Sequence, residues 1–331
     1  MILLLGASGT FGKAFAVELR RRGHSFIPLT RQAFDYTRFD YLFDYLRTMT
    51  PAFLINAAGC PVPADDMGGG PSREQGMLAN ALLPQMIARV CLMTRIPWAH
   101  LSSGSIYTGA KIMEDNQWRV ETDLSREPVR RLFQSHPENF RGFTELDEPN
   151  LSFRSSPGNF FSATKALAEE AIRGIGQCYI WRPRLVFSDS AEPASFLSQF
   201  QRWTRIPDTI DSLSHLEDCV RACLDLWERR APFGIYNVTN PGAVTTRHIA
   251  ELMQRILKPS RPFEFWTDEE NRHRLEGKPP PSHCILDSSK LLAAGVKMRA
   301  LPEALEEALR KIRKAERMAR KTSATSPSSQ A

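Results

Sequence analysis

Long apolar runs are missing from this sequence. No apolar stretch approaches the roughly 20 residues that span a bilayer, and the apolar start from Met1 to Leu5 is too short for a signal peptide and lacks its basic flank. We therefore expect a cytoplasmic protein with no membrane contact. The 331 residues allow two domains, or one large α/β domain with an elaborated C-terminal part.

Cysteines at metal-ligand or disulfide-framework spacing are also missing. Of the six cysteines, only Cys219 and Cys223 are close together, and no further Cys or His accompanies them at ligand spacing. The sequence predicts reduced thiols, several of them buried, and no metal site.

The folded part has little net charge. The formal charge of the chain is +6, but the segment from Lys311 to Ala331 carries six basic residues against one acid, so its net +5 leaves +1 for the first 310 residues. This distribution argues against a nucleic-acid partner. The polar end of that segment predicts a disordered basic tail over residues 311–331. A solubilising end is favoured for this tail over a membrane or RNA contact, and an interaction protein that uses the tail stays open as a further class of function.

What is present at the start is a βαβ pattern. The apolar strand Ile2–Leu5 is followed at once by Gly6-Ala-Ser-Gly-Thr-Phe-Gly12, by helical periodicity from Lys13 to Arg22, and by a second strand from Ser25 to Leu29. Glycines in such a turn let the backbone approach a pyrophosphate, and the helix N-terminus faces its charge. The turn predicts a dinucleotide site that includes Gly6, Ser8, Gly9, Thr10, Phe11 and Gly12.

Alternating strands and helices continue beyond the turn. Strands are expected at Phe53–Asn56, Trp98–Ser102 and Tyr179–Phe187, and helices at Met77–Thr94 and Asn159–Ile175. This order predicts an α/β fold with a Rossmann-type doubly wound parallel sheet. We expect the NAD(P)-binding domain over 1–187, with an insert of irregular texture at about 110–157. A mainly substrate-binding region should follow over 188–310. Helices are expected there at Leu216–Arg229 and Thr246–Leu257, and a last helix at Pro302–Arg320 should continue beyond residue 310.

The residues after the second strand favour NADP over NAD. A site specific for NAD commonly places Asp or Glu there to bind the ribose hydroxyls. This chain has Thr30-Arg31 instead, and a guanidinium can pair with a 2′-phosphate. A solvated arginine remains the alternative.

The motifs together resemble an extended short-chain dehydrogenase/reductase of the branch that contains dTDP-4-dehydrorhamnose reductases and sugar-nucleotide epimerases. The matching stretches run from residue 1 to about 310 and are Gly6–Gly12; Ile55-Asn-Ala-Ala-Gly59, placed after the fourth strand; Asn80; Leu101-Ser-Ser-Gly-Ser-Ile-Tyr107; Asn159-Phe-Phe-Ser-Ala-Thr-Lys-Ala-Leu-Ala-Glu169; Arg182-Pro-Arg184; Gly234–Gly242; and Leu286–Leu291.

The resemblance implies a role for each matched position. It places Ser103 at the family's catalytic Ser or Thr, which bonds the substrate oxygen, and Lys165 at the lysine of Tyr-x-x-x-Lys, which holds the nicotinamide ribose. It implies a nucleotide-sugar substrate, reduction or epimerisation, and a homodimer. The remaining cofactor contacts that we expect are Arg31, Asp35, Tyr36, Asn56, Ala57, Ala58 and Asn80.

One position departs from the family. Phe161 stands four residues before Lys165, where the family has its catalytic tyrosine, and a phenyl ring cannot transfer a proton. Three explanations are open. Ser103, a water molecule or Tyr107 relays the proton; the protein binds nucleotide sugar and cofactor without turnover, in a regulatory or subunit role; or the chemistry has moved to the insert.

The candidates in the insert are His136, Glu145 and Asp147. A lone loop histidine is more often simply exposed. Outside the insert, Arg182 or Arg184 either pairs with a substrate diphosphate or forms a buried structural pair. Asp218, near the start of a helix, is expected to cap that helix rather than to act in catalysis.

Overall fold

The computed structural model describes residues 1–61, 71–155, 159–190, 195–259, 261–278 and 281–324. Its centre is a six-stranded parallel sheet with the order β13-β8-β4-β3-β1-β2. The strands are β1 (Ile2–Leu5), β2 (Phe26–Leu29), β3 (Phe53–Asn56), β4 (Trp98–Leu101), β8 (Cys178–Arg182) and β13 (Gly234–Asn237).

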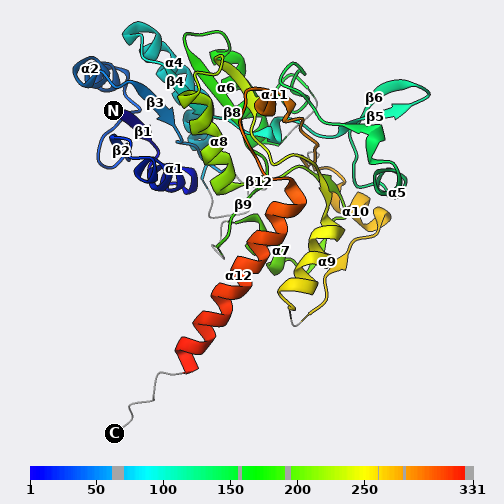
Figure 1. Cartoon of the computed structure of the whole chain (residues 1–331). Coiled ribbons are helices and arrows are strands. Elements are labelled where there is room, and N and C mark those ends of the chain that lie inside the picture. The colour runs from blue at the N-terminus through cyan, green and yellow to red at the C-terminus, as the bar shows by residue number, and fades with distance from the viewer. Residues whose placement is uncertain (62–70, 156–158, 191–194, 260, 279–280, 325–331) are drawn as a thin grey trace.

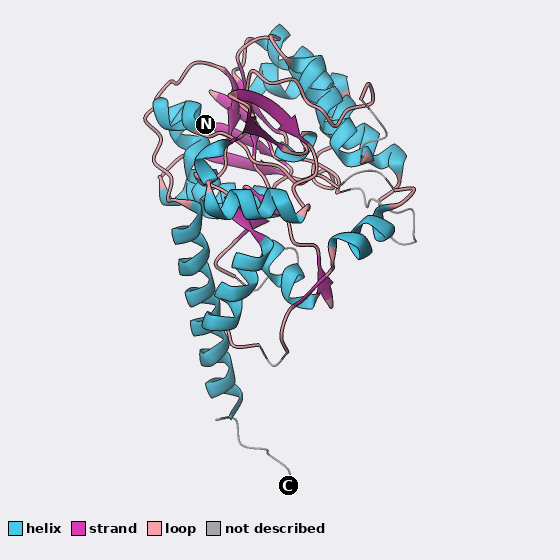
Figure 2. Ribbon diagram, turned by 90° about the vertical axis from the view of Figure 1, so that its right-hand side faces the viewer, coloured by secondary structure: helices cyan, strands magenta, loops and turns pink. Residues whose placement is uncertain are grey.

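Helices cover both faces of this sheet, as Figures 1 and 2 show. Alternate residues of β1 point to opposite faces, so Ile2 and Leu4 join one apolar cluster and Leu3 and Leu5 the other. The first cluster contains residues of α1 (Thr10–Arg21), α8 (Leu216–Glu228) and α11 (Ser289–Ala293). The second contains residues of α2 (Phe39–Met49), α4 (Leu83–Thr94) and α6 (Phe160–Ile172). The predicted doubly wound α/β fold is confirmed.

The order of the strands makes the carboxyl ends of β1 and β3 the candidate ligand site. β1 pairs with both β2 and β3, and Leu5 lies opposite Leu29 on one side and Asn56 on the other. The chain runs from β1 to β2 on one side of β1 and then crosses to β3 on the other side. Such a reversal of strand order is a topological switch point, and ligands of open α/β sheets bind at switch points. The Asn-Ala-Ala-Gly segment follows the third strand, not the fourth as we placed it, because only α2 lies between β2 and β3.

The helix between β3 and β4 is longer and more apolar than we expected. α3 (Arg73–Met77), a π-helical turn (Leu78–Leu82) and α4 form 22 consecutive helical residues, long and apolar enough to cross a membrane. We expected no apolar stretch of membrane-spanning length, and that expectation overlooked this helix, which passes by length and composition. Half of it is buried inside the protein, as in a core helix.

The insert folds into its own small sheet. β5 (Ala110–Glu114) pairs antiparallel with β6 (Gln117–Glu121) and with β7 (Phe140–Arg141), and α5 (Glu127–Ser135) and a 3-10 turn (Pro137–Asn139) lie between the last two strands. Leu124 and Val129 pack with Ile210 and Ile285, so the insert is anchored to the C-terminal part of the chain. Residues 156 and 157 of the expected insert lie outside the described residues.

The C-terminal part is built from mostly short elements and one long helix, α12, and contains a third apolar cluster. These are β9 (Val186–Phe187), α7 (Phe196–Arg202), β10 (Arg205–Ile206), β11 (Ile210–Asp211), β12 (Ser214–His215), β14 (Val244–Thr245), α9 (Thr246–Ile256), β15 (Glu264–Phe265), α10 (Asp268–Leu275) and α12 (Leu301–Ala324). The strand expected over Tyr179–Phe187 is two strands, β8 and β9. Because α8 and β13 return to the main sheet, the chain does not divide cleanly at residue 187.

The expected disordered tail is helical over most of its length. α12 continues to Ala324, and Figure 1 shows it leaving the body of the protein. Ile312 is 3% exposed in the third apolar cluster, and the Lys311 ammonium lies 2.9 Å from Asp189. Disorder is therefore wrong for residues 311–324, because the apolar stripe of the helix continues past Leu309; residues 325–331 lie outside the described part.

Candidate active site

The glycine turn between β1 and α1 has the geometry that a dinucleotide site requires. Gly6 has φ +74°, and a Cβ there would lie 2.5 Å from the Ala58 nitrogen. A Cβ on Gly12 would lie 2.1 Å from the Gly6 oxygen, because α1 packs directly on the turn. A Cβ on Gly9 would meet only the Gly6 oxygen, at 3.5 Å. Gly6 and Gly12 are thus fixed by packing, whereas Gly9 faces open space.

The N-terminus of α1 is open to an anion. Gly9 is its N-cap and provides no side-chain cap, and the first turn contains no acidic residue. Ser8, Gly9 and Thr10 are exposed, and Phe11 packs partly against the core. The Ala7 and Gly9 amides bond to backbone oxygens, whereas the amides of Ser8, Thr10, Phe11 and Gly12 have no backbone partner among the described residues and suit a diphosphate.

The residues after β2 surround the same turn. Tyr36 is buried, and its hydroxyl receives a hydrogen bond from the Gly6 backbone. Asp35 is exposed and accepts hydrogen bonds from the Thr37 hydroxyl and amide, which lower the pKa of Asp35. Arg31 is exposed, and its charge acts on Asp35, Tyr36 and Cys60. Arg31 follows β2 at the carboxyl end of the sheet.

The exit of β3 is shaped by the buried amide of Asn56. Its Oδ1 accepts from the Ala58 nitrogen at 3.1 Å, and its Nδ2 donates to His100 Nδ1 at 3.2 Å. Ala57 and Ala58 are half-buried beside the glycine turn. Burial and the charge of Lys165 hold the pKa of His100 well below its usual value, so this imidazole is neutral.

Asn80 fixes the chain just after the Asn-Ala-Ala-Gly segment. Its side chain accepts from the Cys60 nitrogen and donates to the Cys60 oxygen, both at 2.8 Å. A Cβ on Gly59 would lie 3.5 Å from both Asn80 Oδ1 and Lys165 Nζ. Gly59, Asn80 and Lys165 therefore converge, although they come from three different segments.

Lys165 is a buried ammonium group on α6. Its Nζ donates to the Leu101 oxygen at 3.1 Å, at the carboxyl end of β4. Burial lowers the pKa of Lys165 to about 8, and the opposite charge of Glu169 offsets part of that effect. The cost of this burial suggests a functional role for the charge.

Phe161 lies near this lysine, and Ser103 follows β4, whose last residue Leu101 accepts the hydrogen bond from Lys165. Asn159 caps α6, which begins at Phe160, and Lys165 Nζ lies 6.0 Å from the centroid of the Phe161 ring. Ser103 is 9% exposed and accepts a hydrogen bond from the Ser105 amide at 3.1 Å. The hydroxyl proton of Ser103 has no acceptor within the described residues.

Tyr107 is held away from a role as proton donor. Its hydroxyl donates to the Asp147 oxygen at 2.6 Å and accepts from Arg182 at 2.9 Å, and burial raises its pKa. Arg182 in turn forms a buried ion pair with Glu169, whose carboxylate also accepts from Ser102. Although burial disfavours its charge, Glu169 raises the pKa of Arg182.

The titratable residues of the insert are engaged elsewhere. His136 is exposed and pairs with Glu138, Asp147 pairs with Lys111, and Glu145 accepts from the Asn237 backbone. Burial raises the pKa of Glu145. These contacts do not support the hypothesis that the chemistry has moved to the insert.

The two arginines after β8 form buried structural pairs. Arg182 binds Glu169, and Arg184 binds Asp211 at 2.7 Å and the Ser105 hydroxyl at 3.1 Å. Of the two alternatives for these arginines, the structure supports structural pairing. Arg184 nevertheless positions the segment that carries Ser103.

The start of α8 differs from our expectation. The cap is His215, whose ring accepts from the Asp218 nitrogen, while the Asp218 carboxylate pairs with Arg221 and Arg299. Asp189, His215 and Glu217 lie at metal-ligand spacing, and Lys311 contacts Asp189. A resident ammonium at that carboxylate opposes a cation there.

Sequence reasoning missed His100 and Glu169 as parts of the site. His100 lies inside an apolar strand, and that placement is the signal for a buried, bonded imidazole. Glu169 follows Lys165 by four residues, so the two share one face of α6. The distant partners of both residues are not visible in the sequence.

Comparisons with known proteins agree with this geometry. A family model described as "RmlD substrate binding domain" matches residues 1–314. A bifunctional dTDP-4-dehydrorhamnose 3,5-epimerase/dTDP-4-dehydrorhamnose reductase of Arabidopsis thaliana is 30% identical over 165 residues, which are 50% of this chain and 52% of the relative. A trifunctional enzyme of the same plant, with UDP-4-keto-L-rhamnose-reductase as one of its named activities, is 28% identical over 78% of this chain and 35% of its own length.

Two solved structures share the fold. The L780 UDP-rhamnose synthase of Acanthamoeba polyphaga mimivirus superposes with a TM-score of 0.75 at 19% identity, over 94% of this chain and 99% of that one. A dTDP-4-dehydrorhamnose reductase of Bacillus anthracis, solved with NADP, gives a TM-score of 0.68 at 17% identity, over 94% and 97%. The chain spans about half of the first curated relative, so these names describe the relatives.

The family model covers the glycine turn, the Asn-Ala-Ala-Gly segment and the helix of Lys165 in one continuous match. The chain therefore belongs to the RmlD substrate-binding-domain family.

Proposed function

We propose that this protein is an NAD(P)-dependent reductase of a nucleotide-activated 4-keto-deoxysugar. The observation that carries the proposal is the buried Lys165, which converges with Gly59 and Asn80 beside an open glycine turn. Relatives named as reductases of dTDP-4-dehydrorhamnose and UDP-4-keto-L-rhamnose support the substrate class. Epimerisation is the alternative reaction, since both use hydride transfer.

The residues of the turn fit a dinucleotide. Gly9 leaves room for a diphosphate, the amides at the start of α1 are free to bind it, and Lys165 would hold the nicotinamide ribose. When bound, the cofactor supplies the hydride. Arg31 carries a positive charge near the end of β2, which favours NADP over NAD because it can pair with a 2′-phosphate.

The chain's own residues then have distinct tasks. Ser103 bonds the keto oxygen of the sugar, and the Lys165 ammonium stabilises negative charge that develops nearby. Phe161 provides no proton, and the Tyr107 hydroxyl is bonded to Asp147. We infer that the proton comes from Ser103 or from water, at a rate about 10²- to 10⁴-fold below that with a positioned tyrosine.

Phe161 also favours a second candidate function. A protein that binds cofactor and nucleotide sugar without turnover would keep the glycine turn and Lys165 but need no proton donor. Such a protein would act as a regulator or subunit of another enzyme.

The deciding experiment measures binding and turnover on the same protein. NADPH fluorescence is titrated first, and NADPH oxidation is then followed with dTDP-4-dehydrorhamnose and with its UDP counterpart. Turnover that Ser103→Ala abolishes supports the reductase. Binding without turnover, with activity gained in Phe161→Tyr, supports the non-catalytic candidate. Absence of any NADPH binding would overturn both.

We also propose a cytoplasmic homodimer. All six cysteines are free thiols, as in a reducing compartment. The exposed apolar side chains of the helix of residues 73–94 and of α6 define a candidate apolar surface, namely Leu78, Leu82, Leu92, Met93 and Leu167. An exposed patch of this kind on a soluble protein suits a second copy of the chain.

A further inference from the structure

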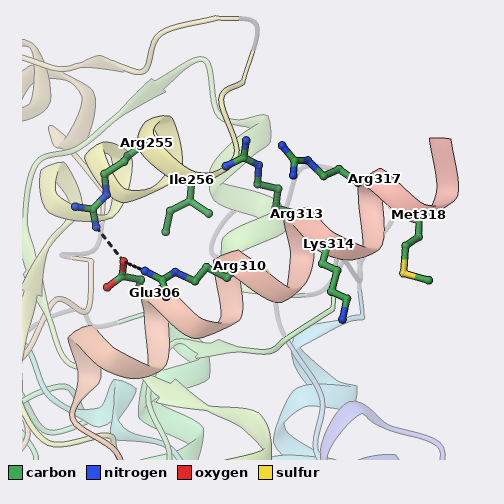
Figure 3. A pocket seen from close by; sticks show the side chains of 8 residues that line it. All are labelled: Arg255, Ile256, Glu306, Arg310, Arg313, Lys314, Arg317 and Met318. Carbon is green, nitrogen blue, oxygen red and sulfur yellow. Dashed lines mark hydrogen bonds and ion pairs between the residues drawn. The ribbon is translucent and has the colours of Figure 1, made fainter. Parts of the chain in front are cut away.

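A basic pocket that contains no residue of the glycine turn lies between α9 and α12 (Figure 3). Its volume is about 870 Å³. Five cations line it, one from α9 and four from α12, namely Arg255, Arg310, Arg313, Lys314 and Arg317. Glu306 is the single acid among the lining residues, so the pocket carries a strong net positive charge.

Glu306 organises one end of the basic pocket. Its carboxylate lies 3.4 Å from Arg255 and 2.8 Å from Arg310, as the dashed lines in Figure 3 show. Both guanidiniums remain largely exposed, with 65% and 71% of their side chains accessible. One carboxylate therefore holds two cations in place without covering either of them.

The other three cations have no ion-pair partner within the described residues. Arg313, Lys314 and Arg317 follow Arg310 at helical spacing, so the four lie on one side of α12 over about 10 Å. The opposite side of the helix packs onto the body through Ile312, which is 3% exposed. Like charges so close together repel each other, and an anionic partner would relieve that repulsion.

The shape and lining of the basic pocket narrow the choice of partner. The pocket is hollowed between two helices, whereas a bilayer presents a flat surface, and the apolar side of α12 is already packed, so it cannot insert. Among the described residues, no aromatic ring lines the pocket, so these residues offer single-stranded bases nothing to stack on. Ile256 and the 62% exposed Met318 instead provide apolar contacts beside the cations.

We propose that the basic pocket is a docking site for an acidic segment of a partner protein, in which carboxylates alternate with apolar side chains. The carboxylates pair with Arg313, Lys314 and Arg317, and an apolar side chain contacts Ile256 and Met318. None of the residues that line this pocket is among those assigned above to the cofactor or to the sugar.

The test is fluorescence anisotropy of the full-length protein with a labelled peptide rich in glutamate and carrying spaced leucines. We expect saturable binding that weakens as salt rises. The double variant Arg313→Glu/Arg317→Glu should weaken it by about tenfold or more. The matched control is Arg119→Glu/Lys297→Glu, which makes the same charge change at two exposed positions outside the pocket and should bind as the parent does.

Further probes separate the alternatives. A peptide with serine in place of leucine should bind more weakly, because it loses the apolar contacts. Tighter binding of oligodeoxythymidylate or of phosphatidylserine vesicles than of the acidic peptide would overturn the proposal, as would equal weakening in the control variant. Circular dichroism confirms that the variants fold; should the double variant unfold, Lys314→Glu alone is tested against Arg119→Glu, with the same expected direction.

Discussion

At the residue scale, Lys165 and Phe161 lie side by side on α6, one a buried ammonium group and the other a ring without a titratable group. Lys165 carries a buried positive charge that has no carboxylate among its hydrogen-bond partners, only the Leu101 oxygen. Phe161 stands beside it with a ring that accepts no proton. The charge that would lower a tyrosine's pKa is therefore present without the tyrosine.

Restoring the hydroxyl should restore proton transfer. We expect Phe161→Tyr to raise the rate of NADPH oxidation with a 4-keto nucleotide sugar by about 10²- to 10⁴-fold, because a phenol beside Lys165 is a positioned acid. Steady-state kinetics on parent and variant check this. A Phe160→Tyr control should stay at the parent's rate, and an unchanged rate in Phe161→Tyr would show that proton transfer does not limit turnover.

The buried ammonium should also be visible in the pH dependence of stability. The pKa of Lys165 is about 8 in the folded protein and 10.5 ordinarily, so between these values the unfolded chain binds more protons. The stability of the parent should therefore rise with pH across this window relative to Lys165→Met, by about 3 kcal/mol, while the full cost of burial is present below pH 8. Urea unfolding of both proteins at several pH values measures this difference, and a difference independent of pH would contradict it.

Several residue contacts were beyond sequence reasoning. Tyr107 was an open candidate for proton transfer, yet its partners Asp147 and Arg182 lie 40 and 75 positions away along the chain. Arg184 and Asp211, 27 positions apart, each lie just before one of the two paired strands β9 and β12. A short sequence motif does not show which distant residues form hydrogen bonds with its side chains.

At the element scale, the glycine turn was the most predictable feature. A strand, three spaced glycines and a helix occur in sequence order within 22 residues, so all the information is local. The two-residue strands from β9 to β12 were not predictable, because two residues contain no periodicity. The break between β8 and β9 occurs at Pro183, which cannot donate to a sheet ladder.

The glycines of this turn should separate folding from binding. Gly12→Ala should destabilise the protein by several kcal/mol, because its Cβ would overlap the Gly6 oxygen. Gly9→Ala meets no close atom and should leave stability within about 0.5 kcal/mol while weakening NADPH binding. Thermal unfolding and NADPH titration of both variants test the pair, and undiminished NADPH binding by Gly9→Ala would place the diphosphate elsewhere.

At the scale of the whole molecule, α12 begins in the third apolar cluster and extends out of the body of the protein. Composition predicted disorder from Lys311 onward because the segment is basic and its end is polar. The prediction failed since Leu309 and Ile312 continue an apolar stripe that packs against α9. Compositional arguments average over both sides of a helix, whereas packing depends on one side.

Two truncations should locate the end of the folded body. Deleting residues 311–331 removes the burial of Ile312 and the pair of Lys311 with Asp189, and should destabilise the protein by about 1.5–3 kcal/mol. Deleting residues 315–331 keeps both and should change stability by no more than about 0.5 kcal/mol. Urea unfolding compares them, and equal stabilities would mean that Ile312 adds nothing to the core.

The apolar surface on the helix of residues 73–94 makes a prediction about assembly. Leu82 is 46% exposed and lies one turn from Leu78, which is 51% exposed. A charge at Leu82 has to be desolvated if a second copy covers this surface, so Leu82→Glu should shift a dimer towards monomer. Sedimentation of the parent and the variant measures this shift.

Val120, exposed on the β5–β6 hairpin, provides the matched control. Val120→Glu adds the same charge at an apolar position outside this surface and should leave the assembly state unchanged. A parent that sediments as a monomer would remove the proposed dimer. Equal weakening of the dimer by both variants would contradict an interface on the apolar surface, because Leu82 belongs to that surface and Val120 does not.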